Sequence, residues 1–122
     1  MRPAIPKLLV RSVLALALAV ALYQAISPHH VAVSIPRDDL EHALWAYGLT
    51  ALGIAAFPQT RAVFIGAVLI ASSGVAELLQ PLVGRGAELS DWASSAAGVA
   101  AAMAPLVAVA SRTMHRSSGV RD

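Results

Sequence analysis

The chain has no cysteine among its 122 residues, which excludes disulfide bonds, thiolate metal sites and a cysteine nucleophile. Charged side chains are scarce as well. They make up 13% of the chain, against about 25% in a typical soluble domain. Aromatic residues make up 5%. So few charged side chains cannot cover a surface that faces water, and the composition therefore excludes a soluble enzyme domain.

Long apolar runs take the place of a charged surface. Hydrophobic residue types make up 57% of the chain. A helix that crosses a bilayer needs roughly 20 predominantly apolar residues in succession. Four runs approach this length, and proline or glycine residues separate them. The sequence therefore predicts an all-α integral membrane bundle of four transmembrane helices, in a single domain over residues 1–122. The helices are expected at about residues 8–26, 40–57, 62–80 and 92–110.

The runs differ in ways that bear on this prediction. The second has a clean apolar part of only Ala43–Phe57, and Pro105 is expected to break the fourth. Residues Ser111–Asp122 are expected to form a polar, frayed cytoplasmic tail. A cleaved signal peptide is the alternative for the N-terminal run, but the three runs that follow favour a retained helix. A soluble bundle is disfavoured because Val13–Leu22 and Ala96–Ala110 have no polar face.

The basic residues are divided unequally between the two sides of such a bundle. Two of the nine, Arg37 and Arg85, fall on one side. The other seven fall on the opposite side, in the N-terminal arm, in the loop between the second and third helices, and in the tail: Arg2, Lys7, Arg11, Arg61, Arg112, Arg116 and Arg121. Because basic loops stay in the cytoplasm, the sequence predicts a multi-pass protein of the plasma membrane with both termini cytoplasmic.

Most acidic residues fall on the outer side, away from the seven basic residues. Side chains from distant parts of the sequence are expected there at one membrane depth. Spacings of three and four residues place Glu77 with Gln80, and Asp38 with His42, on common helix faces. The candidate catalytic residues carry groups that can accept a proton: Glu77, His42 and Asp91. The candidate substrate-binding residues carry guanidinium, amide and carboxylate groups: Arg85, Gln80 and Asp38.

Each candidate also has a structural explanation. An acid at the edge of an apolar span usually faces the bundle interior with a partner. The structural alternatives for Glu77 are an ion pair with Arg85 or an interfacial position in water, and Arg85 could equally neutralise Asp91. Asp91 is at least a side-chain cap for the start of the fourth helix. Gln80 more often bonds a neighbouring helix. His42 is equally well explained as a polar residue at a helix start.

The remaining patterns favour structure over chemistry. The adjacent His29 and His30 lack a second, well-spaced pair of ligands, so the sequence predicts no metal site and no cofactor. Trp92 fits an aromatic belt at the outer interface. Nothing in the sequence suggests nucleic-acid readout. Small residues recur every four positions in the fourth run and indicate close helix contact: Ser94, Gly98 and Ala102.

The segment from Ala76 to Asp91 resembles the VanZ-like family of small bacterial membrane proteins. It is similar to the family's pattern of a helix that ends in Glu-x-x-Gln, here Glu77 and Gln80, followed by Arg85 after a short loop and by an aspartate that opens the next helix. This is a match at several points with the family's spacing. The resemblance extends over about residues 38–104.

Positions outside this segment carry both matches and departures. Asp38 and His42 match the family's Asp-Lys-x-x-His, and Gly98 matches a glycine of its last helix. Asp39 occupies the family's lysine position, which weakens the case for a Lys–Glu pair here. Tyr47 lies one residue later than the family's usual tyrosine. Position 95 is a serine where the family often has an asparagine.

The resemblance implies a protein of the bacterial cell envelope, because the founding member is associated with resistance to the glycopeptide teicoplanin. Its outward polar site would change how a glycopeptide or a cell-wall lipid is handled, with membrane lipid and a cell-wall precursor or glycopeptide as partners. Two alternatives stay open. One is a membrane-embedded enzyme, with Glu77 or His42 as general base and Arg85 holding an anionic lipid or lipid-linked substrate. The other is a structural or assembly partner, in which the polar layer only fixes helix register. The chain could also form a homo-oligomer.

Overall fold

The computed structural model describes residues 5–27, 38–84 and 86–119, and for Asp38 it describes the backbone alone. These residues form four α-helices and one 3₁₀ turn, and they contain no strand. The prediction of an all-α chain is therefore confirmed over the part of the chain that the structure describes. The elements are α1 (Lys7–Ile26), α2 (Asp38–Ala56), α3 (Ala62–Leu79), η1 (Gln80–Val83) and α4 (Leu89–Ser118).

The first three helices lie close to their expected bounds, but the fourth differs from its prediction in three ways. It begins at Leu89 instead of Trp92, Pro105 lies inside α4 without breaking it, and residues 111–118 continue the helix instead of forming a frayed tail. Proline is tolerated in membrane helices because the surroundings can satisfy the freed backbone groups. The hydroxyl groups of Ser111 and Thr113 bond back to carbonyls of their own helix. His115 and Arg116 lie in the last turn, where positive charge favours the helix dipole.

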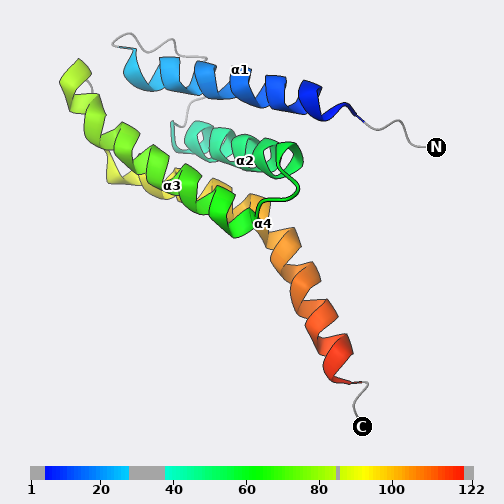
Figure 1. Cartoon of the computed structure of the whole chain (residues 1–122). Coiled ribbons are helices and arrows are strands. Elements are labelled where there is room, and N and C mark those ends of the chain that lie inside the picture. The colour runs from blue at the N-terminus through cyan, green and yellow to red at the C-terminus, as the bar shows by residue number, and fades with distance from the viewer. Residues whose placement is uncertain (1–4, 28–37, 85, 120–122) are drawn as a thin grey trace.

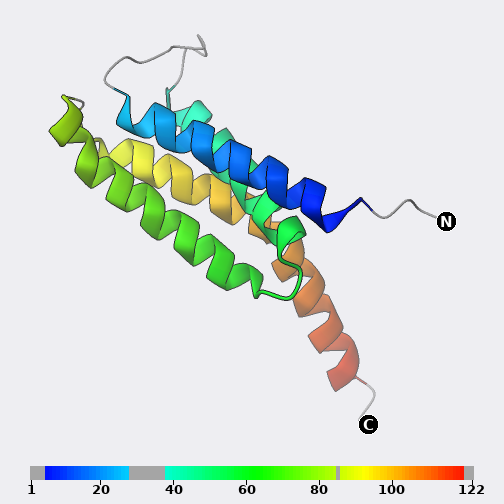
Figure 2. The same ribbon diagram turned by 45° about the horizontal axis from the view of Figure 1, so that its top comes forward.

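The four helices run alternately up and down in one bundle (Figures 1 and 2). The most extensive contact is between α2 and α4, while α1 covers α2 and α3 packs on α4. The N-terminal end of α1 and the C-terminal half of α4 lie toward the same end of the bundle. The opposite end gathers the last turn of α1, the first turns of α2 and the turn from α3 through η1 into α4. Residues far apart in sequence, such as His42 and Asp91, therefore meet at one end.

Glycines in two helices allow this packing. Gly98 of α4 is buried against α2, and a Cβ atom at this position would overlap the carbonyl group of Ala43. Gly66 of α3 likewise faces Val99 and Met103 of α4. In lipid the hydrophobic effect does not drive helices together, so helices there associate through small residues that let their backbones approach closely. The predicted contact face of the fourth helix is thus confirmed at Gly98.

Apolar side chains cover the outside of the bundle and polar side chains are buried inside it, the reverse of the usual arrangement in a soluble protein. Large apolar side chains point outward along the helices; Leu78, for example, is 77% exposed. Among the described residues, the buried hydrophobic side chains are Leu14, Ala56 and Val99. The buried polar and charged side chains are more numerous: Ser27, Thr50, Glu77, Gln80, Asp91 and Ser95. Soluble monomers rarely expose apolar patches of this extent, whereas a lipid environment favours them.

Three segments are long and apolar enough to cross a membrane: Lys7–Ile26, Ala62–Val83 and Leu89–Ser118. The buried share of their most apolar windows is only 6%, 11% and 17%, so most of their apolar surface faces outward. Together with the buried polar side chains, these segments are typical of a membrane protein. The helix α2 is not among them, since its first turns carry Asp39, Glu41 and His42.

Candidate functional site

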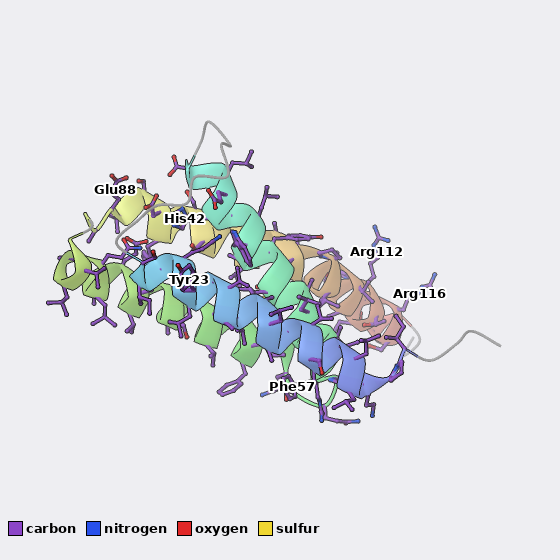
Figure 3. The ribbon with its side chains drawn as sticks, turned by 90° about the horizontal axis from the view of Figure 1, so that it is seen from above. Tyr23, His42, Phe57, Glu88, Arg112 and Arg116 are labelled. Carbon is purple, nitrogen blue, oxygen red and sulfur yellow. The ribbon has the colours of Figure 1, made fainter. Side chains whose placement is uncertain are left out.

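A polar cluster lies at the end of the bundle where α2 and α4 begin and α3 ends. His42 from α2, Glu77 from α3 and Asp91 from α4 each direct one possible ligand atom toward the others, and these atoms lie within 4.8 Å of one another. Figure 3 shows His42 and Glu88 at this end, far from Arg112 and Arg116 at the other. The structure thus brings together all three candidate catalytic residues from three different helices.

The turn between α3 and α4 places Glu77 and Asp91 on the same level. Gln80 and Pro81 tighten the end of α3 into η1, and the chain then reverses at Gly84, whose φ is +79°. This left-handed conformation favours glycine because it has no Cβ atom. The fourth helix starts soon afterwards, at Leu89, so that Asp91 lies in its first turn.

Glu77 is fixed by two donors on one of its oxygens. Its side chain is almost fully buried, at 8% exposure, and Oε2 accepts a hydrogen bond from the backbone N–H of Glu88 at 3.2 Å. With its amide nitrogen turned toward the acceptors, Gln80 donates to the same Oε2 at 3.0 Å and to the carbonyl of Gly86 at 3.2 Å. Gln80, which the sequence placed on one helix face with Glu77, thus ties the carboxylate to the turn that leads into α4.

Asp91 faces His42 across the contact between α2 and α4. Its Oδ1 lies 3.7 Å from His42 Nδ1, which is beyond hydrogen-bonding distance. Asp91 is 9% exposed, and Oδ1 is buried without a hydrogen-bond partner among the described residues. The prediction that Asp91 caps the helix is wrong, because the helix starts earlier and Glu88 occupies the N-cap position. Asp91 still lies in the first turn, where the helix dipole favours a negative charge.

A cavity of about 260 Å³ opens beside the cluster and is lined by residues from all four α-helices. Most of its wall is apolar, with Leu18 and Leu22 from α1, Leu49 from α2 and Leu69 from α3. His42 and Glu77 of the polar cluster line the same wall, together with the neighbouring Gln80. The cavity therefore joins a long apolar surface to a small group of polar side chains, as binding sites for organic molecules commonly do.

Two of the candidate residues are not placed in this arrangement. Arg85 lies outside the described residues, as do His29 and His30, so the expected pair of Glu77 with Arg85 is not tested. Asp38 begins α2, but its side chain is not described. Trp92, which the sequence placed in an interfacial belt, donates its indole N–H to the carbonyl of Ile70 at 3.1 Å and so links α4 to α3.

Sequence reasoning missed several polar residues of the cavity wall. Gln24, Glu41, Ser72, Ser73 and Ser95 all line it. Gln24 could have been predicted, because it is a polar residue close to the end of an apolar run and such residues usually face the bundle interior. It also missed that His42, Glu77 and Asp91 together offer a set of metal ligands, because the only pair considered for metal was His29 with His30.

Comparisons of the chain with models of protein families, with curated proteins and with solved structures find no match.

Proposed function

We propose that the chain is a VanZ-like protein of the bacterial cell membrane, whose polar cluster faces outward and takes the headgroup of an amphipathic envelope molecule. In this proposal all four helices cross the bilayer and both termini are cytoplasmic. The excess of basic residues at one end of the bundle supports the orientation. The length of α2 supports its proposed role as a membrane span in addition to the three apolar segments. Its 19 residues rise about 28 Å, and the hydrocarbon core is about 30 Å thick.

The observation that carries the proposal is the cavity beside the polar cluster. Its leucine-rich wall suits an acyl or polyprenyl chain, while His42, Glu77 and Gln80 offer acceptors and donors to a polar headgroup. Carboxylates accept hydrogen bonds from hydroxyl and amide groups, which are abundant in sugars and peptides. A lipid-linked cell-wall precursor combines both parts. A protein that binds such a precursor would change how a glycopeptide reaches its target, in line with the resistance that the resemblance implies.

The proposal is tested by teicoplanin susceptibility in a sensitive bacterial host. The host expresses the wild-type chain, Glu77→Ala or the control Glu88→Gln, with membrane levels matched by immunoblotting. Glu88 has an exposed side chain and contributes only its backbone N–H to Glu77, so its substitution leaves the cluster intact. We expect the wild type and Glu88→Gln to raise the inhibitory concentration and Glu77→Ala to leave it at the level of the empty host.

Other outcomes would direct the function elsewhere. Equal insertion of all three chains with no change in susceptibility would remove the resistance role. If the Glu77→Ala chain does not accumulate in the membrane while the wild-type chain does, the result would favour the alternative function. In that alternative the chain is a structural or assembly partner, and its polar layer only fixes helix register.

One contact favours a membrane-embedded enzyme as the second candidate. The carboxylate of Asp91 lies 3.7 Å from the imidazole of His42, and a carboxylate that closes this distance to a hydrogen bond would orient the histidine as a general base. The substrate would be an anionic lipid or lipid-linked molecule in the cavity. This candidate predicts that His42→Gln abolishes turnover of a polyprenyl-phosphate-linked substrate in proteoliposomes while membrane abundance stays at the wild-type level. Equal turnover by both chains would exclude His42 as the base.

A further inference from the structure

We infer that His42, Glu77 and Asp91 form a binding site for a divalent transition-metal ion, with Zn²⁺ as the ion that matches the ligand set best. The three residues supply one imidazole nitrogen and two carboxylate oxygens from three helices. Zinc accepts both kinds of ligand, and sites with three protein ligands leave a fourth position for water or another molecule. Calcium and magnesium prefer sets made of oxygen atoms alone, so a histidine ligand disfavours both.

The distances suit a single ion. Two atoms bound to the same zinc at about 2.1 Å, in tetrahedral geometry, are separated by about 3.4 Å. The distance from His42 Nδ1 to Asp91 Oδ1 is 3.7 Å, close to this value. The three ligand atoms all lie within 4.8 Å of one another. Glu77 therefore has at most about 1.4 Å to move toward the other two ligands, the difference between 4.8 Å and the tetrahedral separation.

Asp91 gives an independent indication. Its Oδ1 is buried and receives no hydrogen bond from the described residues, although it belongs to a side chain that carries a charge. Native structures rarely leave such an atom without a partner, because burying it unpaired is costly. The atom points toward His42. A cation between the two side chains would provide the missing partner of Oδ1.

The surroundings of Glu77 resemble the support that metal ligands receive in known sites. Ligating carboxylates are themselves held by hydrogen bonds from an outer layer of residues. Both donors to Glu77, the Gln80 amide and the Glu88 N–H, end on Oε2. This arrangement fixes the carboxylate and directs these bonds away from Oε1. Glu77 can thus offer Oε1 to an ion while Oε2 stays bonded to the turn.

The charge of the site points the same way. Two carboxylates lie within a few ångströms of each other, next to a leucine-lined cavity and among membrane helices. A divalent cation offsets their repulsion in surroundings of low dielectric constant. Because His42 and Glu77 also line the cavity, the fourth position of the ion would face it. There the ion would attract a phosphate or carboxylate headgroup, and this last step rests on the proposed function.

The test is Zn²⁺ binding by the purified full-length chain in detergent. Isothermal titration gives the affinity, and metal analysis after dialysis gives the stoichiometry. We expect one Zn²⁺ per chain, and a loss of affinity of at least about 100-fold in both His42→Gln and Asp91→Asn, because removing a ligand exceeds the 10–100-fold effect of outer residues. The control Glu88→Gln, whose carboxylate is exposed near the site, should bind as the wild type does. Mg²⁺ and Ca²⁺ should bind more weakly than Zn²⁺.

Circular dichroism and gel filtration establish that each variant keeps the helix content and the size of the wild type. Because the two ligand variants lie on different helices, either one that folds is sufficient for the comparison. A wild-type chain that binds no stoichiometric Zn²⁺ would overturn the metal site. So would ligand variants that bind as tightly as the wild type, or a Glu88→Gln chain that loses as much affinity as they do.

The metal site and the proposed function fail separately in these experiments. Zinc binding by a chain that leaves teicoplanin susceptibility unchanged supports the metal site and contradicts the resistance role. A chain that raises the inhibitory concentration through Glu77 but binds no zinc supports the function and contradicts the metal.

Discussion

Gly98 in α4 lies against the backbone of Ala43 in α2, at a distance that leaves no room for a side chain. Ala43 directly follows His42 in the sequence, and Asp91 lies two turns before Gly98 on the same buried face of α4. The close approach of these two backbones therefore sets how near His42 comes to Asp91. Packing in the middle of the bundle and the geometry of the polar cluster are parts of one arrangement.

A methyl group at position 98 should disrupt this arrangement. Gly98→Ala places a Cβ atom on the Ala43 carbonyl and forces the two helices apart, at a cost of about 1–3 kcal/mol for overpacking. We expect a lower melting temperature in detergent and weaker Zn²⁺ binding. Gly48 is the matched control, since a Cβ atom there would contact nothing within 4 Å. Gly48→Ala should be neutral or slightly stabilising, and equal melting temperatures for the two variants would contradict the close approach.

Gln80 should stabilise the protein through Glu77. Replacing it with leucine keeps the size of the side chain but removes the donor to Glu77 Oε2 and to the Gly86 carbonyl. A buried charged group that loses a hydrogen bond costs about 1–3 kcal/mol. We expect Gln80→Leu to melt at a lower temperature, and its Zn²⁺ affinity to fall by about 10–100-fold as for other outer residues of metal sites. Wild-type values for both would show that Gln80 does not hold the carboxylate.

Trp92 should contribute to the contact between α3 and α4. Its indole N–H donates to the Ile70 carbonyl, and Gly74 provides the space for the ring. Trp92→Phe removes the hydrogen bond and keeps an aromatic ring, so we expect a loss of about 0.5–1.5 kcal/mol in the free energy of unfolding. The measurement is reversible unfolding in mixed micelles. An unchanged free energy would mean that Trp92 acts only as the interfacial side chain that the sequence suggests.

Much of the polar cluster could be predicted from the sequence, because the lengths of the apolar runs fix which residues lie at the same end. Glu77 closes the third run and His42 opens the second, so alternating helices must bring them to one level. Their exact separation could not be predicted. It depends on how closely α2 approaches α4 at Gly98, and a small-residue stripe gives the contact face without the distance.

The bounds of α4 were the least predictable feature of the fold. Pro105 predicts a break in the helix, yet α4 continues through it. Proline removes one backbone hydrogen bond of the helix, and a membrane helix tolerates this loss because its surroundings can satisfy the freed carbonyl. Because residues 111–118 are polar, the sequence predicts a frayed tail. Their hydroxyl groups instead donate hydrogen bonds to backbone carbonyls of α4. The start of the helix at Leu89 moved Asp91 from the cap into the first turn, where its carboxylate faces α2.

The proposed function requires the polar cluster to face the outside of the cell, and the lack of cysteine makes this orientation directly measurable. Single cysteines are introduced as Glu88→Cys, next to the cluster, and as Thr60→Cys, which is exposed in the turn between α2 and α3 at the other end of the bundle (Figure 1). Intact cells are treated with a membrane-impermeant maleimide. We predict labelling of Glu88→Cys in intact cells and of Thr60→Cys only after permeabilisation. The reverse pattern would place the cluster in the cytoplasm and contradict an outward-facing site.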